Sequence, residues 1–392
     1  KNIASQILAF LHYGEDFTSH RPYIDIERHK DRQAQIRTIF IKFDWPKSVG
    51  PELALVFRDY IHRSFQGTIN QYLTPRCVIA FMCDLVGATD EHARVLDFEC
   101  GSGGFLAGMI DKGIKLENIR GIDIDDLPYV LAKTYIALYF KKVGNDQIAT
   151  LPIKHENGLF YQGNDWDIVI GNPAGGNKYE HDKLEKIAES LSLDLDNNGK
   201  QDSLSEYSLS IQQAVTSCSD GGKVCLILPE GLFSNSNDEY LRKYISNNCK
   251  ILAIISLPRG VFKKGTTVKQ QTKGSQVSSQ KMSILYLEKS KQSNNYPIFI
   301  ASLSDPKDKS NRLDDWLEPE LNLVLAQWKS WLSSDKLLDQ TDQSVLYKIE
   351  SHNPVQETLL PQEQIVTEEE KPRQLELKSK TVLGRFSDLF KK

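Results

Sequence analysis

The stretch of sequence that decides the fold is Arg94-Val95-Leu96-Asp97-Phe98-Glu99-Cys100-Gly101-Ser102-Gly103-Gly104-Phe105. It opens with a short aliphatic run that ends in an acidic residue, a pattern typical of a buried strand. A glycine-rich turn follows, and residues 106–110 then favour a helix. Because the turn has almost no side chains, a ligand can approach its backbone closely. The stretch therefore predicts a strand, a ligand-binding loop and the start of a helix.

Similar units surround this stretch. From about residue 67 to residue 290, short apolar runs alternate with helical patterns, which indicates βαβ units and a mostly parallel sheet. The expected strands are residues 95–97, 118–123, 166–170, 223–228, 251–256 and 282–288. A polar loop separates the last two, and we expect them to form an antiparallel hairpin at an edge of the sheet. The predicted fold class is α/β with a Rossmann-like architecture.

The patterns outside the main domain, residues 67–290, are different. Residues 1–66 have mostly helical spacing and predict a small N-terminal helical region. Residues 291–350 are expected to be a C-terminal helical extension, with an amphipathic helix at 316–333. Residues 351–392 contain several prolines, an acidic run and a final apolar stripe, and they predict a linker with a short amphipathic tail.

The composition is typical of a globular protein. The chain has 392 residues and a net charge of −4, with 40% hydrophobic and 26% charged residues. No apolar run is long enough to span a membrane, so a cytoplasmic protein without membrane contact is expected. The six cysteines and eight histidines show no metal-ligand spacing. We therefore expect no metal site, and thiols that are reduced and buried.

Acidic residues near the glycine loop narrow the choice of ligand. Asp97 could reach an ammonium group, and loop amides at a helix N-terminus favour a carboxylate. Asp123 ends the next expected strand and could accept hydrogen bonds from both hydroxyls of a ribose, with Asp125 as the alternative. These groups suit S-adenosylmethionine (AdoMet). A nicotinamide cofactor fits less well, because the third glycine of Gly-x-Gly-x-x-Gly is absent, and a plain strand–helix turn is the other alternative.

At this point the chain resembles a known family. Residues 97–106 are similar to the Asp-Pro-Ala-Cys-Gly-Ser-Gly-Gly-Phe-Leu motif of N6-adenine DNA methyltransferases, specifically the modification subunits of type I restriction–modification systems. Upstream, Tyr72-Leu73-Thr74-Pro75-Arg76 resembles the family's Tyr-Thr-Pro-Arg element. Downstream, residues 257–262 resemble its Leu-Pro-x-Gly-x-Phe element. The resemblance covers about residues 60–290 and includes several elements in the family's order.

The resemblance implies a set of AdoMet-binding residues. They are Asp97, Gly101, Ser102, Gly103, Gly104, Phe105, Asp123, Asn157, Thr74 and Pro75. Within this set, the Thr74-Pro75 turn would cap a helix and touch the methionine end of AdoMet. Asn157 stands where the family often has an aspartate near the adenine ring of AdoMet, so one hydrogen-bond acceptor is kept and its charge is lost.

The catalytic loop of the family corresponds to Asn172-Pro173-Ala174-Gly175. In the family's Asn-Pro-Pro-aromatic loop, the asparagine oxygen and the first proline carbonyl accept hydrogen bonds from the adenine amino group. These bonds localise the nitrogen lone pair and aim it at the methyl group, so that positioning does most of the work. The aromatic residue stacks on the base, which is flipped out of the duplex. Asn172 and Pro173 are therefore the expected catalytic residues.

The second half of this loop departs from the family, with Ala174 in place of proline and Gly175 in place of the aromatic residue. One hypothesis is an active enzyme in which Tyr179, Trp166 or Phe233 replaces the ring. A second is a catalytically inactive subunit that serves as a binding or scaffold component, and a third is another methyl acceptor. If the missing ring is the only defect, Gly175→Phe is expected to raise activity.

The expected partners follow from the resemblance and the charge. DNA is the expected substrate, reached through a complex, because a protein that held DNA alone would usually carry a basic surplus. A separate specificity subunit would recognise the DNA sequence, and other defence-system subunits are further expected partners.

Overall fold

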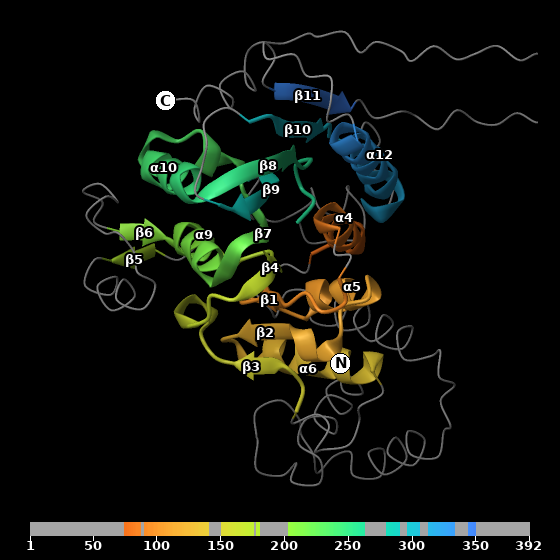
Figure 1. Ribbon diagram of the computed structural model, residues 1–392, viewed down its shortest axis with the longest axis vertical. Helices are drawn as coiled ribbons and strands as arrows, with labels where there is room; N and C mark the ends of the chain where they lie inside the picture. Colours follow the sequence, from red (N-terminus) through yellow and green to blue (C-terminus); the bar gives the residue numbers. More distant parts are fainter. Residues whose placement is uncertain are drawn as a thin grey trace, which may run out of the picture.

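The computed structural model describes residues 74–87, 90–140, 150–175, 178–180, 203–262, 280–290, 296–305, 313–333 and 344–349. The predicted N-terminal region at 1–66, the loop at 263–279 and the linker with its tail at 351–392 lie outside the described residues. Within the described residues the chain forms a nine-stranded sheet in the order β11-β10-β8-β9-β7-β4-β1-β2-β3. Helices cover both faces of this sheet (Figure 1).

The strands of the large sheet are β1 Val95–Asp97, β2 Ile119–Asp123, β3 Ile153–His155, β4 Trp166–Gly171, β7 Cys218–Pro229, β8 Cys249–Ser256, β9 Met282–Lys289, β10 Ile298–Leu303 and β11 Ser344–Ile349. All neighbouring strands run parallel except β9, which is antiparallel to both β7 and β8. This arrangement confirms the predicted α/β fold with a mostly parallel sheet.

The hairpin of β8 and β9 is antiparallel as predicted, but its predicted place at the sheet edge is wrong. Strand β10 pairs in parallel with β8, and β11 lies beyond it. The apolar run Ile298-Phe299-Ile300-Ala301 is largely buried in β10, although the sequence had placed it in a helical extension. Strand β3 escaped prediction because only Ile153 of its three residues is buried. The predicted domain boundaries at residues 66, 290 and 350 stay predictions.

The helices divide between the two faces of the sheet. Helices α4 (Arg76–Val86), α5 (Gly104–Asp111), α6 (Asp126–Tyr139) and α12 (Leu313–Ser333) cover one face, while α9 (Glu206–Ser217) and α10 (Glu239–Asn248) cover the other. The buried side chains under α4, α5, α6 and α12 form the first core, and those under α9 and α10 form the second core. Side chains alternate along each strand, so Ile168 and Ile170 of β4 belong to the first core and Val169 belongs to the second.

Short elements complete the described chain. A separate two-stranded antiparallel sheet pairs β5 (Lys178–Glu180) with β6 (Ser203–Ser205). The 3-10 turns are η2 Leu116–Asn118, η3 Gly158–Phe160, η4 Glu230–Phe233 and η5 Ser236–Asp238.

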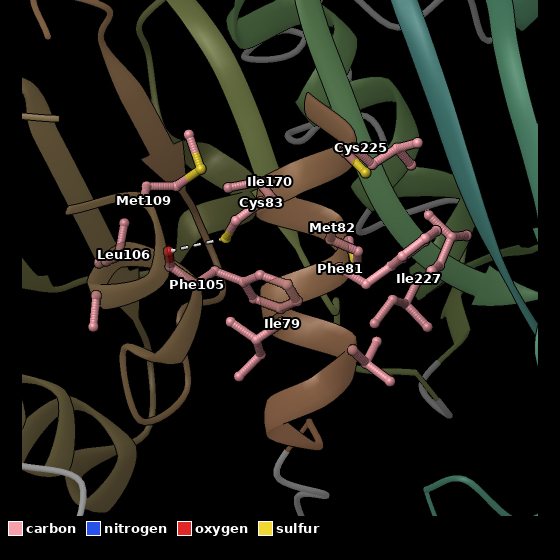
Figure 2. Close-up of a cluster of buried hydrophobic side chains, with 14 of the residues drawn as sticks. Ile79, Phe81, Met82, Cys83, Phe105, Leu106, Met109, Ile170, Cys225 and Ile227 are labelled. Carbon is pink, nitrogen blue, oxygen red and sulfur yellow. Dashed lines mark hydrogen bonds between the residues drawn. The ribbon is translucent and has the colours of Figure 1, made fainter. Parts of the chain in front are cut away.

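Helix α4 holds the start of α5 in place (Figure 2). The thiol of Cys83 points at the carbonyl oxygen of Phe105, 4.0 Å away, and Phe105 is the second residue of α5. A Cβ atom at Gly108 would lie 2.8 Å from the Cys83 sulfur, so glycine lets the two helices approach closely. All six cysteines are buried and none of them is in a disulfide bond, so the prediction that these thiols are buried is confirmed. Contacts with α4 therefore hold the glycine loop in place on the side where α5 begins.

The amphipathic helix predicted at 316–333 is confirmed as α12, which begins at Leu313. Its apolar side is buried, and Trp328 packs edge-on against Phe299 of β10 with 5.4 Å between ring centroids. This contact explains why the extra strands and α12 belong to the same core. None of the helices in the described ranges combines the length and the apolar character that a membrane crossing needs.

Candidate cofactor and catalytic site

The predicted site residues gather at the carboxyl ends of three neighbouring strands. Asp97 ends β1, Asp123 ends β2 and Asn172 directly follows β4. Strand β1 lies between the other two in the sheet, so its glycine loop reaches the space above all three. Ligands of open α/β sheets bind at this edge.

The glycine loop has a backbone that favours glycine. Gly101 and Gly103 have φ angles of 52° and 78°, in the left-handed region that L side chains rarely adopt. A Cβ atom at Gly103 would also touch Ala132 of α6 at 3.4 Å, whereas nothing lies within 4 Å of one at Gly101. Ser102 is partly exposed between them, and Gly104 and Phe105 are buried at the start of α5. The loop is therefore open on the side of Gly101.

Asp123 connects the glycine loop to the second strand. Its Oδ2 accepts a hydrogen bond from the amide of Gly101 at 2.8 Å, and its Oδ1 accepts one from the amide of Asp125 at 3.0 Å. Burial raises the pKa of Asp123 to about 6, although these two hydrogen bonds act in the opposite direction. Asp125 is exposed at the N-terminus of α6. Of the two acids predicted for a ribose contact, Asp123 is therefore the one that is hydrogen-bonded to the glycine loop.

The environment of Asp97 disfavours its ionised form unless a positive charge lies beside it. Its side chain is buried, and burial together with the nearby Asp123 carboxylate raises its pKa well above the usual value. An ammonium group beside it would favour the ionised form again. Across the described residues, no group of three or more His, Cys, Asp or Glu side chains could hold a metal ion.

Asn157 precedes a turn that lies directly on the end of β1. Its Oδ1 accepts a hydrogen bond from the amide of Leu159 at 3.0 Å, which orients the side chain. A Cβ atom at Gly158 would overlap the carbonyl oxygen of Phe98, so only glycine allows this approach. Ile124, directly after Asp123, and Phe160, two residues after Gly158, have exposed apolar side chains. The exposure of these two side chains could not be predicted from the sequence, because it depends on the fold.

Thr74 orients the predicted catalytic asparagine. The Nδ2 of Asn172 donates a hydrogen bond to the Oγ1 of Thr74 at 3.2 Å, so the Oδ1 of the same amide is left to accept one. Pro75 is the N-cap residue of α4, and its carbonyl accepts hydrogen bonds from the amides of Val78 and Ile79. Pro173 is buried, while Ala174 and Gly175 are exposed. The structure thus brings together Thr74 and Asn172, which are distant in sequence.

Two of the three rings suggested as substitutes for the missing aromatic residue do not suit that role. Trp166 begins β4, at the opposite end from Asn172, and its Nε1 donates to the Tyr161 hydroxyl at 3.1 Å. Phe233 is enclosed in the second core with 1% exposure, so it offers no face to a base. The side chain of Tyr179 lies outside the described residues.

Sequence reasoning also missed Glu99 and Tyr207. The Oε2 of Glu99 accepts a hydrogen bond from the amide of Ala174 at 2.6 Å, and its Oε1 accepts one from the hydroxyl of Ser210 at 2.9 Å. Burial raises the pKa of Glu99 to about 8, and the two hydrogen bonds oppose this shift. The ring of Tyr207 lies against Gly175. One available signal was that Glu99 stands where the resembled motif has alanine.

Comparison with known proteins identifies the family. The model of the family described as N-6 DNA Methylase matches residues 58–371. The chain belongs to this family. Among its relatives, the type I restriction enzyme EcoEI methylase subunit of Escherichia coli is 26% identical over 221 residues, which are 52% of this chain and 41% of that protein. The chain spans less than half the length of the curated relatives it matches.

Solved structures share the fold of this N-6 DNA methylase. A Listeria monocytogenes protein named as a class I S-adenosylmethionine-dependent methyltransferase gives a TM-score of 0.58 at 19% identity, covering 84% of this chain and 92% of that one. The methyltransferase subunit of a type I restriction–modification system from Streptococcus thermophilus gives a TM-score of 0.57 at 16% identity, covering 78% and 63%. At such identities the likeness shows the fold alone.

Proposed function

We propose that this chain binds AdoMet and transfers its methyl group to N6 of adenine in DNA, as a modification subunit that works with a separate specificity subunit. The observation that carries the proposal is the amide of Asn172. It lies at the carboxyl end of β4, is oriented by Thr74, and stands beside the glycine loop with its oxygen left to accept. Family membership supports the same reaction.

The residues at the carboxyl edge of the sheet fit AdoMet. The ammonium of its methionine part would offset the burial of Asp97 and the repulsion from Asp123, which together raise the pKa of Asp97. The Asp123 carboxylate would accept from the ribose hydroxyls, and the open side of Gly101 would let the ligand approach the backbone. Ser102, Gly103, Gly104 and Phe105 complete the loop, with Asn157 at the adenine end. When bound, AdoMet supplies a methyl group on a positively charged sulfur.

Asn172 and Pro173 would prepare the acceptor. The amino nitrogen of adenine is a weak nucleophile because its lone pair is delocalised into the ring. Hydrogen bonds from this amino group to Asn172 Oδ1 and to the Pro173 carbonyl would localise the lone pair and direct it at the methyl group. The transfer is in line and needs no covalent intermediate on the protein, so its rate depends on alignment. The adenine must leave the duplex to reach these two acceptors.

The partners belong to the same proposal. A net charge of −4 does not suit a chain that holds DNA alone, which favours a second subunit with a phosphate-binding surface. The relative from Escherichia coli is itself named as the methylase subunit of a type I restriction enzyme. A specificity subunit, and further subunits of a defence complex, would therefore complete the DNA-binding surface.

Methyl incorporation tests the proposal against a scaffold role. The full protein, purified with the partners that accompany it, is incubated with labelled AdoMet and DNA that lacks adenine methylation, beside a control without DNA. We expect label in the DNA. A preparation that binds AdoMet by calorimetry but transfers no label would contradict the proposed activity.

The affinity for AdoMet is expected to depend on pH through Asp123. With a pKa of about 6 for this carboxyl, its ionised form predominates above pH 6 and is lost below it. The dissociation constant for AdoMet, measured by calorimetry between pH 5 and 8, should therefore rise as the pH falls. Asp123→Asn should weaken binding at pH 8 by about tenfold or more, since hydrogen bonds to a charged group are lost, and should remove the pH dependence near 6.

Asp125→Asn is the matched control for this measurement, because Asp125 carries the same group two residues away. It is expected to change the dissociation constant by less than about threefold, since an exposed carboxylate contributes little. A larger loss from Asp125→Asn than from Asp123→Asn would reassign the ribose contact to Asp125.

A further inference from the structure

The catalytic loop lacks an aromatic side chain of its own, yet an aromatic ring lies against it. We infer that Tyr207 of α9 supplies the ring that stacks on the flipped base, in the place that the family motif gives to the residue after Ala174. This inference rests on the proposed function and names the residue that captures the base. It also links three departures from the family motifs, at Glu99, Ala174 and Gly175.

The first observation is steric. A Cβ atom at Gly175 would overlap the Cζ, Cε2 and Oη atoms of Tyr207. The far end of the tyrosine ring therefore fills the space into which a side chain at position 175 would project. In the resembled motif an aromatic side chain starts from this position. An aromatic ring is therefore present at the loop, but it belongs to α9, which packs on the second core.

The second observation concerns how Tyr207 is held. It is the second residue of α9, whose N-terminus is capped by Ser205, with the Ser205 hydroxyl accepting from the Ser208 amide at 3.2 Å. The ring packs against the second core and remains partly exposed. A ring that is fixed on one side and exposed on the other can stack on a base with little further loss of side-chain entropy.

The third observation is the bridge made by Glu99. Proline has no amide hydrogen, so alanine at 174 is what allows the hydrogen bond to Glu99 at 2.6 Å. The other oxygen of Glu99 accepts from Ser210, which lies three residues after Tyr207 and so on the same side of α9. Glu99 thus ties the catalytic loop to the helix side that carries the ring. The three departures fit one arrangement in which α9 supplies the ring.

This arrangement reverses the expectation for Gly175→Phe. A phenylalanine at position 175 would have to displace the Tyr207 ring, so the single variant should methylate DNA less well than the wild type. Removing the tyrosine at the same time vacates the space. The double variant Gly175→Phe/Tyr207→Ala should therefore recover part of the activity that Tyr207→Ala loses.

The experiment compares kcat/KM for DNA methylation by the full protein with its partners. Tyr207→Ala and Tyr207→Leu are expected to lower kcat/KM by about 5- to 150-fold, the range for loss of one base–aromatic stack. Tyr207→Phe keeps the ring and should stay within about threefold of the wild type, because stacking does not need the hydroxyl. Calorimetry should give the same AdoMet dissociation constant for all of them, since the cofactor residues lie on other elements.

Two controls separate stacking from packing. If Tyr207→Leu is as active as Tyr207→Phe, or if Gly175→Leu/Tyr207→Ala recovers as much as the phenylalanine double variant, apolar volume is sufficient and the inference is wrong. Unchanged kcat/KM in Tyr207→Ala would overturn it as well, and in each of these cases the wild type still methylates DNA. Failure of the wild type itself to transfer methyl groups would instead refute the proposed function.

Discussion

Methyl transfer to DNA is expected to fall by at least about 100-fold when Asn172 is replaced by alanine, which is the scale for removing one acceptor that acts in the transition state. The physical reason is that the Oδ1 of Asn172 is the side-chain oxygen placed to accept from the adenine amino group. Its amide nitrogen already donates to Thr74 at 3.2 Å. AdoMet binding should be unchanged, because Asp97, Asp123 and the glycine loop remain.

Initial rates of label transfer, with the AdoMet dissociation constant measured on the same preparations, check this prediction. Thr74→Val is the graded control, since it removes the hydrogen bond that orients Asn172 and keeps the shape of the side chain. It is expected to lower the rate by only about 2- to 10-fold, the range for one neutral hydrogen bond. An Asn172→Ala enzyme that transfers at the wild-type rate would rule out the assigned role.

Replacing Gly158 by alanine is expected to have the largest effect on stability. A Cβ atom at this position would overlap the carbonyl oxygen of Phe98, which is backbone and has no rotamer through which to escape. The end of β1 and the turn after Asn157 would have to move apart. Forcing atoms into a packed site typically costs about 1–3 kcal/mol or more, so the melting temperature should fall by about 2 °C or more. AdoMet affinity should fall too, because the displaced turn carries Asn157.

Gly113→Ala provides the matched control for this variant. Gly113 has a φ of 101°, but nothing lies within 4 Å of a Cβ atom there. The substitution therefore adds backbone strain of about 1–2 kcal/mol without a collision. It should lower the melting temperature and leave the AdoMet dissociation constant unchanged. Equal AdoMet affinity in Gly158→Ala and the wild type would show that the turn does not contact the cofactor.

The parts of the site that the sequence predicts are those set by local geometry. The left-handed φ angles of Gly101 and Gly103 demand glycine within a few residues of β1, so the loop is visible as a motif. Asp123 can also be predicted, because it ends the strand that comes next along the chain after the glycine loop and its helix. Strand β10 was missed because its apolar run Ile298-Phe299-Ile300-Ala301 lay in a segment interpreted as helical. The burial of this run depends on its packing against α12 and β8, and that packing cannot be recognised from the sequence of the run itself.

Contacts between distant segments explain the rest. Glu99 meets Ala174 across 75 positions and Ser210 across 111, so its role appears only when β1, the catalytic loop and α9 come together. The same holds for Tyr207, whose meeting with Gly175 depends on how α9 lies on the sheet. The departures at positions 99, 174 and 175 look like separate defects in the sequence. In the fold they lie next to one another.

Identification of the methylated nucleoside tests the central claim most directly. DNA is treated with AdoMet and the full protein with its partners, and is then digested to nucleosides. The nucleosides are separated, and each is identified and quantified by mass spectrometry. The Asn172→Ala variant is treated in parallel. We predict N6-methyl-2′-deoxyadenosine from the wild type and a loss of at least about 100-fold in the variant. A methylated cytosine, or an unmodified digest from a preparation that binds AdoMet, would contradict the account.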